Sequence, residues 1–152
     1  MKLDALTRPE LIFPALHAAD RHAVLHILAE SMVTQAPELG DVEALYSKLE
    51  EREALGSTGI GDGVAIPHCK LDGLAEVIMA IGVTREPIDF DAVDEQPVRL
   101  FFLVVSPPDS PAAHLRCLAA ISRWVRSGDH AQRILASHDP VEIQHLLGGL
   151  ES

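Results

Sequence analysis

The chain has 152 residues, of which 47% are hydrophobic, 23% charged and only 4% aromatic, the composition of a globular protein with an aliphatic core. This length predicts a single domain over residues 1–152 that needs neither a metal nor a disulfide to fold. The formal net charge of −11 argues against nucleic-acid binding and against an anionic membrane surface, because both attract basic faces.

The N-terminal third is predicted to contain a short strand and two helices. The apolar run Leu11–Phe13 is typical of a short strand. Asp20 is a typical helix N-cap, and apolar side chains at helical spacing predict a helix that continues to about residue 34. Asp41 opens a second predicted helix, which runs to about Ala54 and ends before a glycine.

The middle of the chain is predicted to contain three strands, over Val64–Ile66, Val77–Val83 and Val98–Val105. The last two are apolar at nearly every position. Such runs are typical of strands that are covered on both faces, as in a sheet flanked by helices.

Two Ser-Pro or Asp-Pro pairs predict helices in the C-terminal third, since proline favours the first helical position. The pair at Ser110 starts a helix to about Arg126, and the pair at Asp139 starts one over Val141–Leu147. The first helix is expected to face inward with Leu115, Leu118, Ile121 and Val125. These elements predict an α/β fold, a single-domain sandwich of a mixed, mostly parallel sheet flanked by helices.

Localisation follows from three features. Residues 1–6 lack the apolar core of a signal peptide, and the longest apolar run, Leu100–Val105, is too short to cross a bilayer. Cys69 and Cys117 fit a reducing compartment better than a disulfide framework. We therefore expect a cytoplasmic protein that does not insert into a membrane.

A glycine-rich stretch is the most informative part of the sequence. It has four glycines in eight residues, 56–63, and is followed by the apolar run that ends at Pro67 and His68. Glycines allow backbone N–H groups to approach an anion closely, and they also form ordinary turns. His68 follows an apolar strand, where α/β folds place their sites. It is a candidate nucleophile, and an inert hydrogen-bonded histidine is the alternative.

Two further residues are candidates for the same site. His114 lies in the first turns of the predicted helix after Ser110, on its inward face, where the helix N-terminus favours a neutral imidazole and attracts phosphate. The alternative is a satisfied core histidine. Arg52 precedes the glycine-rich stretch and could grip phosphate oxygens, although its glutamate neighbours also fit a solvated helix face.

The other histidines suggest no clear site. His22 and His26 have the spacing of a metal-binding pair on a helix, but only His17 lies nearby as a further ligand. A second zinc alternative combines His68 and Cys69 with His114 and Cys117, although adjacent residues rarely bind one metal with good geometry. We expect no metal.

Several of these residues together resemble a known family. They are Arg52-Glu53, the loop Gly56–Gly59 and the segment Ala65–His68, followed by the region Ser110–Leu118. They are similar to the pattern of the enzyme IIA domains of the fructose/mannitol class, which belong to the bacterial phosphoenolpyruvate-dependent phosphotransferase system. The resemblance covers nearly the whole chain, and the combined motif is highly specific.

The resemblance implies a phosphotransferase that carries phosphate on a histidine and needs no cofactor. His68 would accept the phosphoryl group from a small carrier protein related to HPr. His114 would stabilise the phosphate or the imidazole, and Arg52 would stabilise the charge. Ser57, Thr58 and Gly59 would add phosphate-binding donors. The group would pass to an enzyme IIB component, or its presence would be read by regulatory target proteins.

The sequence leaves some alternatives open. A free-standing chain resembles the nitrogen-regulatory branch of the family, with a component of a fructose- or mannitol-type sugar transport system as the alternative. A non-catalytic binding module with the same fold is an alternative of another class. Cys69 departs from the family pattern, where a small residue such as Gly or Ala is more common after the acceptor histidine.

Overall fold

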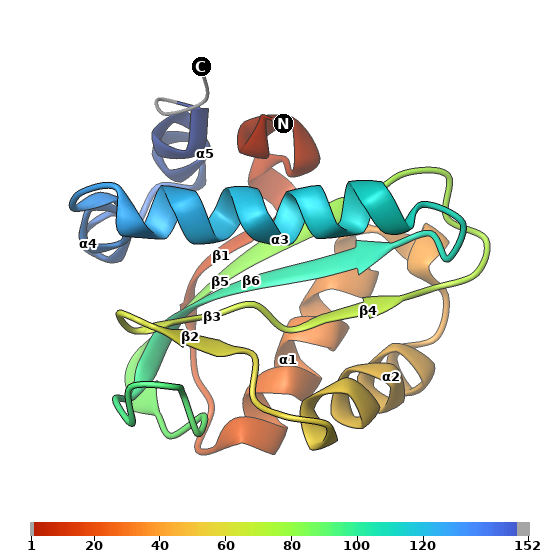
Figure 1. The fold of residues 1–152 in the computed structure, drawn as a ribbon, viewed down its shortest axis with the longest axis horizontal. Helices are drawn as coiled ribbons and strands as arrows, with labels where there is room; N and C mark the ends of the chain where they lie inside the picture. Colours follow the sequence, from red (N-terminus) through yellow and green to blue (C-terminus); the bar gives the residue numbers. More distant parts are fainter. Residues whose placement is uncertain (1, 149–152) are drawn as a thin grey trace.

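The computed structural model describes residues 2–148. Within this range six strands form one mixed sheet in the order β1-β5-β6-β3-β2, and β4 also pairs with β6 (Figure 1). The strands are β1 (Ile12–Leu16), β2 (Gly59–Gly61), β3 (Val64–Ala65), β4 (His68–Lys70), β5 (Ile78–Ile88) and β6 (Val98–Ser106). The pairs β1·β5, β3·β6 and β4·β6 are parallel, whereas β5·β6 and β2·β3 are antiparallel.

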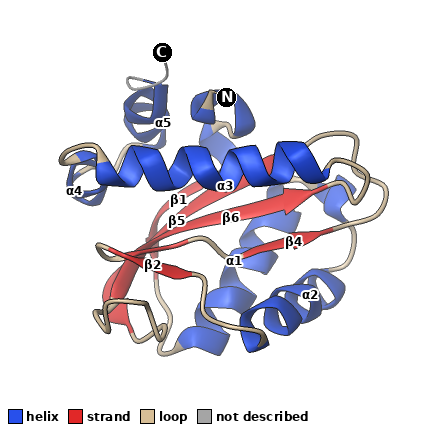
Figure 2. Ribbon diagram, in the orientation of Figure 1, coloured by secondary structure: helices blue, strands red, loops and turns tan. Residues whose placement is uncertain are grey.

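Helices cover both faces of the sheet (Figure 2). Helices α1 and α2 lie on one face, and α3 crosses the other face with α4 and α5 at its C-terminal end (Figure 1). The α-helices are α1 (Arg21–Gln35), α2 (Val42–Ala54), α3 (Pro111–Arg126), α4 (His130–Ala136) and α5 (Pro140–Gly148). Three short 3₁₀ helices complete the described chain: η1 (Leu3–Leu6), η2 (Pro9–Leu11) and η3 (Pro37–Leu39). The predicted α/β sandwich is confirmed. No helix of residues 2–148 is long and apolar enough to span a bilayer.

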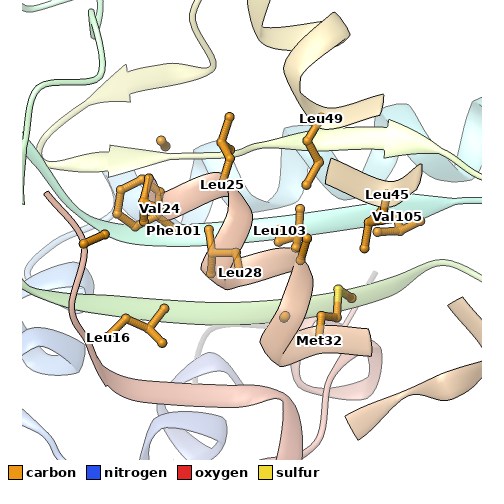
Figure 3. Packing of buried hydrophobic residues seen from close by; sticks show 14 of the residues in the cluster. Leu16, Val24, Leu25, Leu28, Met32, Leu45, Leu49, Phe101, Leu103 and Val105 are labelled. Carbon is orange, nitrogen blue, oxygen red and sulfur yellow. The ribbon is translucent and has the colours of Figure 1, made fainter. Parts of the chain in front are cut away.

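The central strand β6 divides the core into two layers. Phe101, Leu103 and Val105 pack against α1 and α2, in the layer that Figure 3 shows. Phe102 and Val104, which point the other way, pack against α3, α4 and α5. Because successive strand residues face opposite sides, an apolar run this continuous requires helices on both faces, as the sequence predicted.

Aspartate caps fix the starts of three helices where the sequence placed them. Asp20 accepts a hydrogen bond from the amide of Ala23 at 2.8 Å, and Asp41 accepts one from the amide of Ala44 at 3.0 Å. Before α5, the Asp139 carboxylate accepts a hydrogen bond from the amide of Val141 at 3.0 Å. These bonds satisfy amides that have no partner within the helix.

The inward face of α3 differs from the prediction at one position. Leu115 is 65% exposed, whereas Cys117 and Trp124 are buried. Leu118 is partly buried, and Ile121 and Val125 face the core as predicted. The helix therefore lies rotated so that the bulky indole packs inward against Phe102, with 5.7 Å between the ring centroids.

Candidate functional site

The site lies where the strand that begins at Val64 is interrupted. β3 and β4 both pair in parallel with β6, and Ile66 and Pro67 separate them. The sequence predicted His68 after a strand; it is the first residue of β4 instead. The ladder continues through the break, because the carbonyl of Pro67 accepts from the amide of Val104 at 2.9 Å. At this break, the carbonyl of Ile66 faces the ring of His68.

An open pocket of about 410 Å³ surrounds His68. Its lining side chains come from α2 and the residue after it, from β4 and from the start of α3, and Figure 1 shows where these elements lie. Its lining residues are Lys48, Glu51, Arg52, Leu55, His68, Cys69, Lys70 and His114. Its three cationic side chains, Lys48, Arg52 and Lys70, outnumber the single carboxylate of Glu51 in a protein whose formal net charge is −11, and this excess of positive charge favours an anion.

One ring nitrogen of His68 is fixed by the backbone. Its Nδ1 lies 2.7 Å from the carbonyl oxygen of Ile66, which can only accept a hydrogen bond. Nδ1 therefore carries the proton and Nε2 carries the lone pair. This acceptor was missing from the sequence argument, because a backbone carbonyl has no residue-type signal.

Arg52 faces the lone pair of His68. Its Nε donates to Nε2 of His68 at 3.2 Å, and its Nη1 donates to the carbonyl oxygen of Gly56 at 2.8 Å. The second bond anchors the guanidinium at the C-terminal end of α2, so that its plane is directed at the imidazole. Arg52 therefore belongs to the pocket rather than to a solvated helix face.

His114 completes the group from the first turns of α3. Its side chain is buried, and its ring lies edge-on to the ring of His68 with 5.2 Å between centroids. Nδ1 of His114 lies 2.6 Å from Oγ of Ser106, the last residue of β6. No sequence signal marked Ser106, because this residue belongs to no motif and simply follows an apolar run.

Both imidazoles are held in the neutral form. Burial lowers the pKa of His68 from its ordinary value; the bond to the Ile66 carbonyl opposes this effect and the positive charge of Arg52 adds to it. Burial lowers the pKa of His114 to about 4, with further contributions from His68 and Lys70. A neutral His68 can act as a nucleophile through Nε2.

The predicted phosphate-binding loop lies outside this group of residues. Thr58 is 5% exposed, and its amide and hydroxyl donate to the two carboxylate oxygens of Glu53 at 2.8 and 2.7 Å. The hydroxyl of Ser57 donates to the carbonyl of Phe90, and it accepts from the amide of Gly59 at 3.0 Å. The structure therefore brings Arg52, His68 and His114 together, while Ser57, Thr58 and Gly59 bond to groups outside the pocket.

Glu53 has a structural part in the loop that the sequence did not reveal. It is 5% exposed, on the α2 face opposite the solvent, and its carboxylate closes the turn between α2 and β2. The same turn carries the Gly56 carbonyl that orients Arg52. A glutamate that follows an arginine at a helix end gives no signal of burial by itself.

The two cysteines of the histidine–cysteine zinc alternative lie on opposite faces of the sheet. Cys69 packs in the layer of α1 and α2, whereas Cys117 packs beneath α3 on the opposite face of the sheet. Burial raises the pKa of both thiols to about 12, so neither is a thiolate at neutral pH. Among residues 2–148, no group of three or more histidine, cysteine, aspartate or glutamate side chains is arranged to hold a metal.

The helical histidine pair bonds to carboxylates instead. His22 pairs with Glu50, and His26 pairs with Glu43 at 2.8 Å, so both side chains join α1 to α2. His17 pairs with Glu86 at 3.0 Å. These histidines therefore connect elements of the fold rather than converge on one ion.

The chain is similar to known proteins over nearly its whole length. Residues 5–148 match the family described as "Phosphoenolpyruvate-dependent sugar phosphotransferase system, EIIA 2". A nitrogen regulatory protein of Bradyrhizobium diazoefficiens is 40% identical over 149 residues, which cover 97% of this chain and 95% of the relative. A fructose-specific EIIA component of Haloferax volcanii is 30% identical over 145 residues, which cover 95% of this chain and 94% of the relative.

A solved structure shares the fold. The crystal structure of nitrogen regulatory protein IIA-Ntr from Neisseria meningitidis has a TM-score of 0.85 and 24% identity, over 95% of this chain and 98% of that one. The match of the family pattern covers all but the ends of the chain, and the sheet, its flanking helices and the histidine pocket are consistent with it. The chain therefore belongs to the EIIA type 2 family of the phosphoenolpyruvate-dependent phosphotransferase system.

Proposed function

We propose that this protein is a histidine phosphocarrier that accepts a phosphoryl group on Nε2 of His68 from an HPr-like carrier. Residues 1–152 would act as one EIIA domain, of which residues 1 and 149–152 lie outside the described structure. The observation that carries the proposal is the His68 ring, whose Nδ1 is held by the Ile66 carbonyl while Nε2 faces Arg52 in an open basic pocket.

The transfer step balances without a cofactor. The lone pair on Nε2 of His68 attacks phosphorus as the N–P bond of the donor phosphohistidine breaks, and that bond's electron pair stays on the donor nitrogen. Each ring keeps the proton on its other nitrogen. The donor therefore leaves as a neutral imidazole, and His68 becomes a phosphorylated imidazolium. Its Nδ1–H then makes a stronger, charge-assisted bond to the Ile66 carbonyl.

Arg52 would stabilise the charge of the group in transfer. Phosphoryl transfer depends on positive groups and N–H donors arranged in advance around charge spread over three oxygens. In the described structure the Arg52 Nε–H bonds to Nε2 of His68, the atom to which phosphorus would bond. The guanidinium would then bond to phosphoryl oxygens, while its anchor at Gly56 holds it in place.

The regulatory branch of the family is the better supported role. The relative that is 40% identical is named a nitrogen regulatory protein, and we propose that this chain likewise signals through its phosphorylation state, in the cytoplasm. The alternative is a component of a fructose- or mannitol-type transport system, which the fructose-specific relative at 30% identity keeps open. In that case the group would move on to an enzyme IIB component.

Phosphorylation by the relay tests the proposal. The purified protein is incubated with phosphoenolpyruvate, enzyme I and a cognate HPr-like carrier. We expect an acid-labile phosphate on the wild type and on His138→Ala, a control at an exposed histidine, but none on His68→Ala. An unlabelled wild type beside a competent carrier would overturn the proposal and favour a non-catalytic binding module, as would label that persists on His68→Ala.

Onward transfer separates the two branches. The phosphorylated protein is mixed with a fructose- or mannitol-type enzyme IIB domain, and the loss of its label is followed. The regulatory role predicts that the label stays on His68 for much longer than it takes to exchange with the HPr-like carrier. Rapid movement of the label to enzyme IIB would favour sugar transport.

A further inference from the structure

Ser106 lies beneath the site without touching the pocket. It is the last residue of β6, it is fully buried, and it faces α3 because Phe102 and Val104 at alternate positions do so. Its Oγ lies 2.6 Å from Nδ1 of His114. Ser106 is not among the residues that line the pocket, so any role in phosphoryl transfer must pass through His114.

The direction of this hydrogen bond follows from the serine's surroundings. A neutral imidazole has one N–H and one acceptor nitrogen, and a hydroxyl can both donate and accept. Within residues 2–148, Nδ1 of His114 is the one partner found for the Ser106 hydroxyl. If Nδ1 donated the proton, the buried hydroxyl proton would have no acceptor, at a cost of about 1–3 kcal/mol. If the hydroxyl donates, both groups are satisfied.

We propose that Ser106 is a positioning residue that donates its hydroxyl proton to Nδ1 of His114 and thereby keeps the proton of that ring on Nε2. The Nε2–H of His114 is then the donor that meets an oxygen of the phosphoryl group on His68. This inference rests on the proposed function of His68.

The two histidines consequently hold opposite tautomers. The Ile66 carbonyl, which can only accept, places the His68 proton on Nδ1 and leaves Nε2 as a nucleophile. The Ser106 hydroxyl, acting as a donor, places the His114 proton on Nε2. One ring thus presents a lone pair and the other an N–H to the same pocket. Since the pKa of His114 is lowered to about 4, the ring stays neutral at pH 7 and the tautomer decides what it offers.

The wild-type protein tests the tautomer directly. Nitrogen-15 NMR of the unphosphorylated protein distinguishes a protonated ring nitrogen from an unprotonated one. We expect His114 protonated at Nε2 and His68 protonated at Nδ1. A His114 proton on Nδ1 would overturn the inference. This spectrum does not depend on phosphoryl transfer, so the inference can fail while the labelling of His68 succeeds, and the reverse.

Variants test whether the tautomer matters for transfer. Ser106→Ala removes the donor, and we expect the His114 ring to lose its preference for Nε2–H and the phosphoryl transfer rate to fall about tenfold, since one transition-state donor is misplaced. Ser106→Thr keeps a hydroxyl and should restore both readouts. Ser137→Ala, at a buried serine between α4 and α5, is the matched control and should change neither.

A double variant shows whether Ser106 acts through His114. In a His114→Ala background, Ser106→Ala should slow transfer by less than twofold more. A full further tenfold loss there would show that Ser106 acts on transfer by another route and would overturn the proposal. Amide spectra of each variant confirm the fold, and the wild-type tautomer remains decisive if Ser106→Ala does not fold.

Discussion

The histidine pocket and the loop Ser57–Gly59 were both expected to bind phosphate, yet they use their polar groups in opposite ways. In the loop, the Thr58 amide and hydroxyl bond to the carboxylate of Glu53. The Ser57 hydroxyl bonds to the backbone on both sides. In the pocket, Nδ1 of His68 bonds to the backbone, and Nδ1 of His114 bonds to Ser106. Both rings also line the pocket, where Nε2 of His68 faces Arg52.

The difference lies in which hydrogen-bonding groups the fold leaves available. The Thr58 amide and hydroxyl could bind a ligand only by giving up their buried bonds to Glu53, and breaking a buried bond costs about as much as a new one returns. The glycine-rich loop therefore supports the site indirectly, by holding the Gly56 carbonyl that anchors Arg52. His68 and His114, in contrast, both line the open pocket.

Among the residues that surround His68, the largest effect should come from Arg52. Arg52→Ala removes the guanidinium that faces Nε2 of His68, and we expect the phosphoryl transfer rate to fall about 100-fold, the loss typical of a single charge-stabilising donor. Arg52→Lys should recover only part of this, because an ammonium cannot bond to Gly56 and the phosphate in one plane. Rapid-quench transfer from the phosphorylated carrier measures both.

Arg133→Ala is the matched control for Arg52. Arg133 lies on α4, is 59% exposed in its side chain and pairs with Asp129. Its loss should leave the transfer rate within twofold of the wild type. An equal decrease in both variants would mean that general charge, rather than the position of Arg52 at the ring, controls the rate.

Gly59→Ala should separate stability from transfer. A Cβ at this position would lie 2.8 Å from the Cα and Cβ of Ala92, and this Cα cannot give way unless the loop between β5 and β6 moves. We expect the free energy of unfolding to fall by about 1–3 kcal/mol, with the transfer rate per folded molecule unchanged. Urea unfolding and rate measurements on the same sample test this, and a rate loss at constant stability would support the predicted phosphate-binding role of Gly59.

The smallest effect is a dependence of stability on pH that belongs to the pocket. The folded-state pKa of His114, about 4, lies below its ordinary value of 6.5, so the unfolded chain binds the proton first as pH falls. This contribution to stability is complete above pH 6.5 and is lost between about 6.5 and 4. It should amount to about 1 kcal/mol or more in the unfolding free energy.

Comparing variants isolates this contribution from the titration of surface carboxylates. His114→Gln should lose less stability than the wild type between pH 6.5 and 4, because it has no imidazole to protonate. Ser57→Ala, in the loop, should lose as much as the wild type. Parallel curves for all three proteins would contradict the picture of a buried neutral His114.

Much of the fold was predictable because its signals are local. Asp20 and Asp41 cap helices through bonds three residues away, and the two long apolar strands require cover on both faces. The elements that were missed depend on distant pairing. The three-residue strand β4 forms only because it lies beside β6, and β5 continues to Ile88 through polar residues that show no strand pattern. The seven-residue α4 is too short for a periodic signal.

The sequence named three side chains that the structure brings together, but it did not reveal the groups that hold them in place. Arg52, His68 and His114 have the chemistry of the site in their residue types, and the family motif joins them. The Ile66 carbonyl, Ser106 and Glu53 position the site through bonds that only the folded backbone reveals. Ser57 and Thr58 have a suitable chemistry too, but their partners in space were hidden from the sequence.

The nitrogen that carries the phosphate tests the central claim most directly. The protein is phosphorylated by the relay with nitrogen-15 histidine incorporated, and phosphorus–nitrogen coupling identifies the bonded atom. The structure predicts phosphate on Nε2 of His68, with Nδ1 still protonated and bonded to the Ile66 carbonyl. Phosphate on Nδ1 of His68, or on any other histidine, would contradict the account.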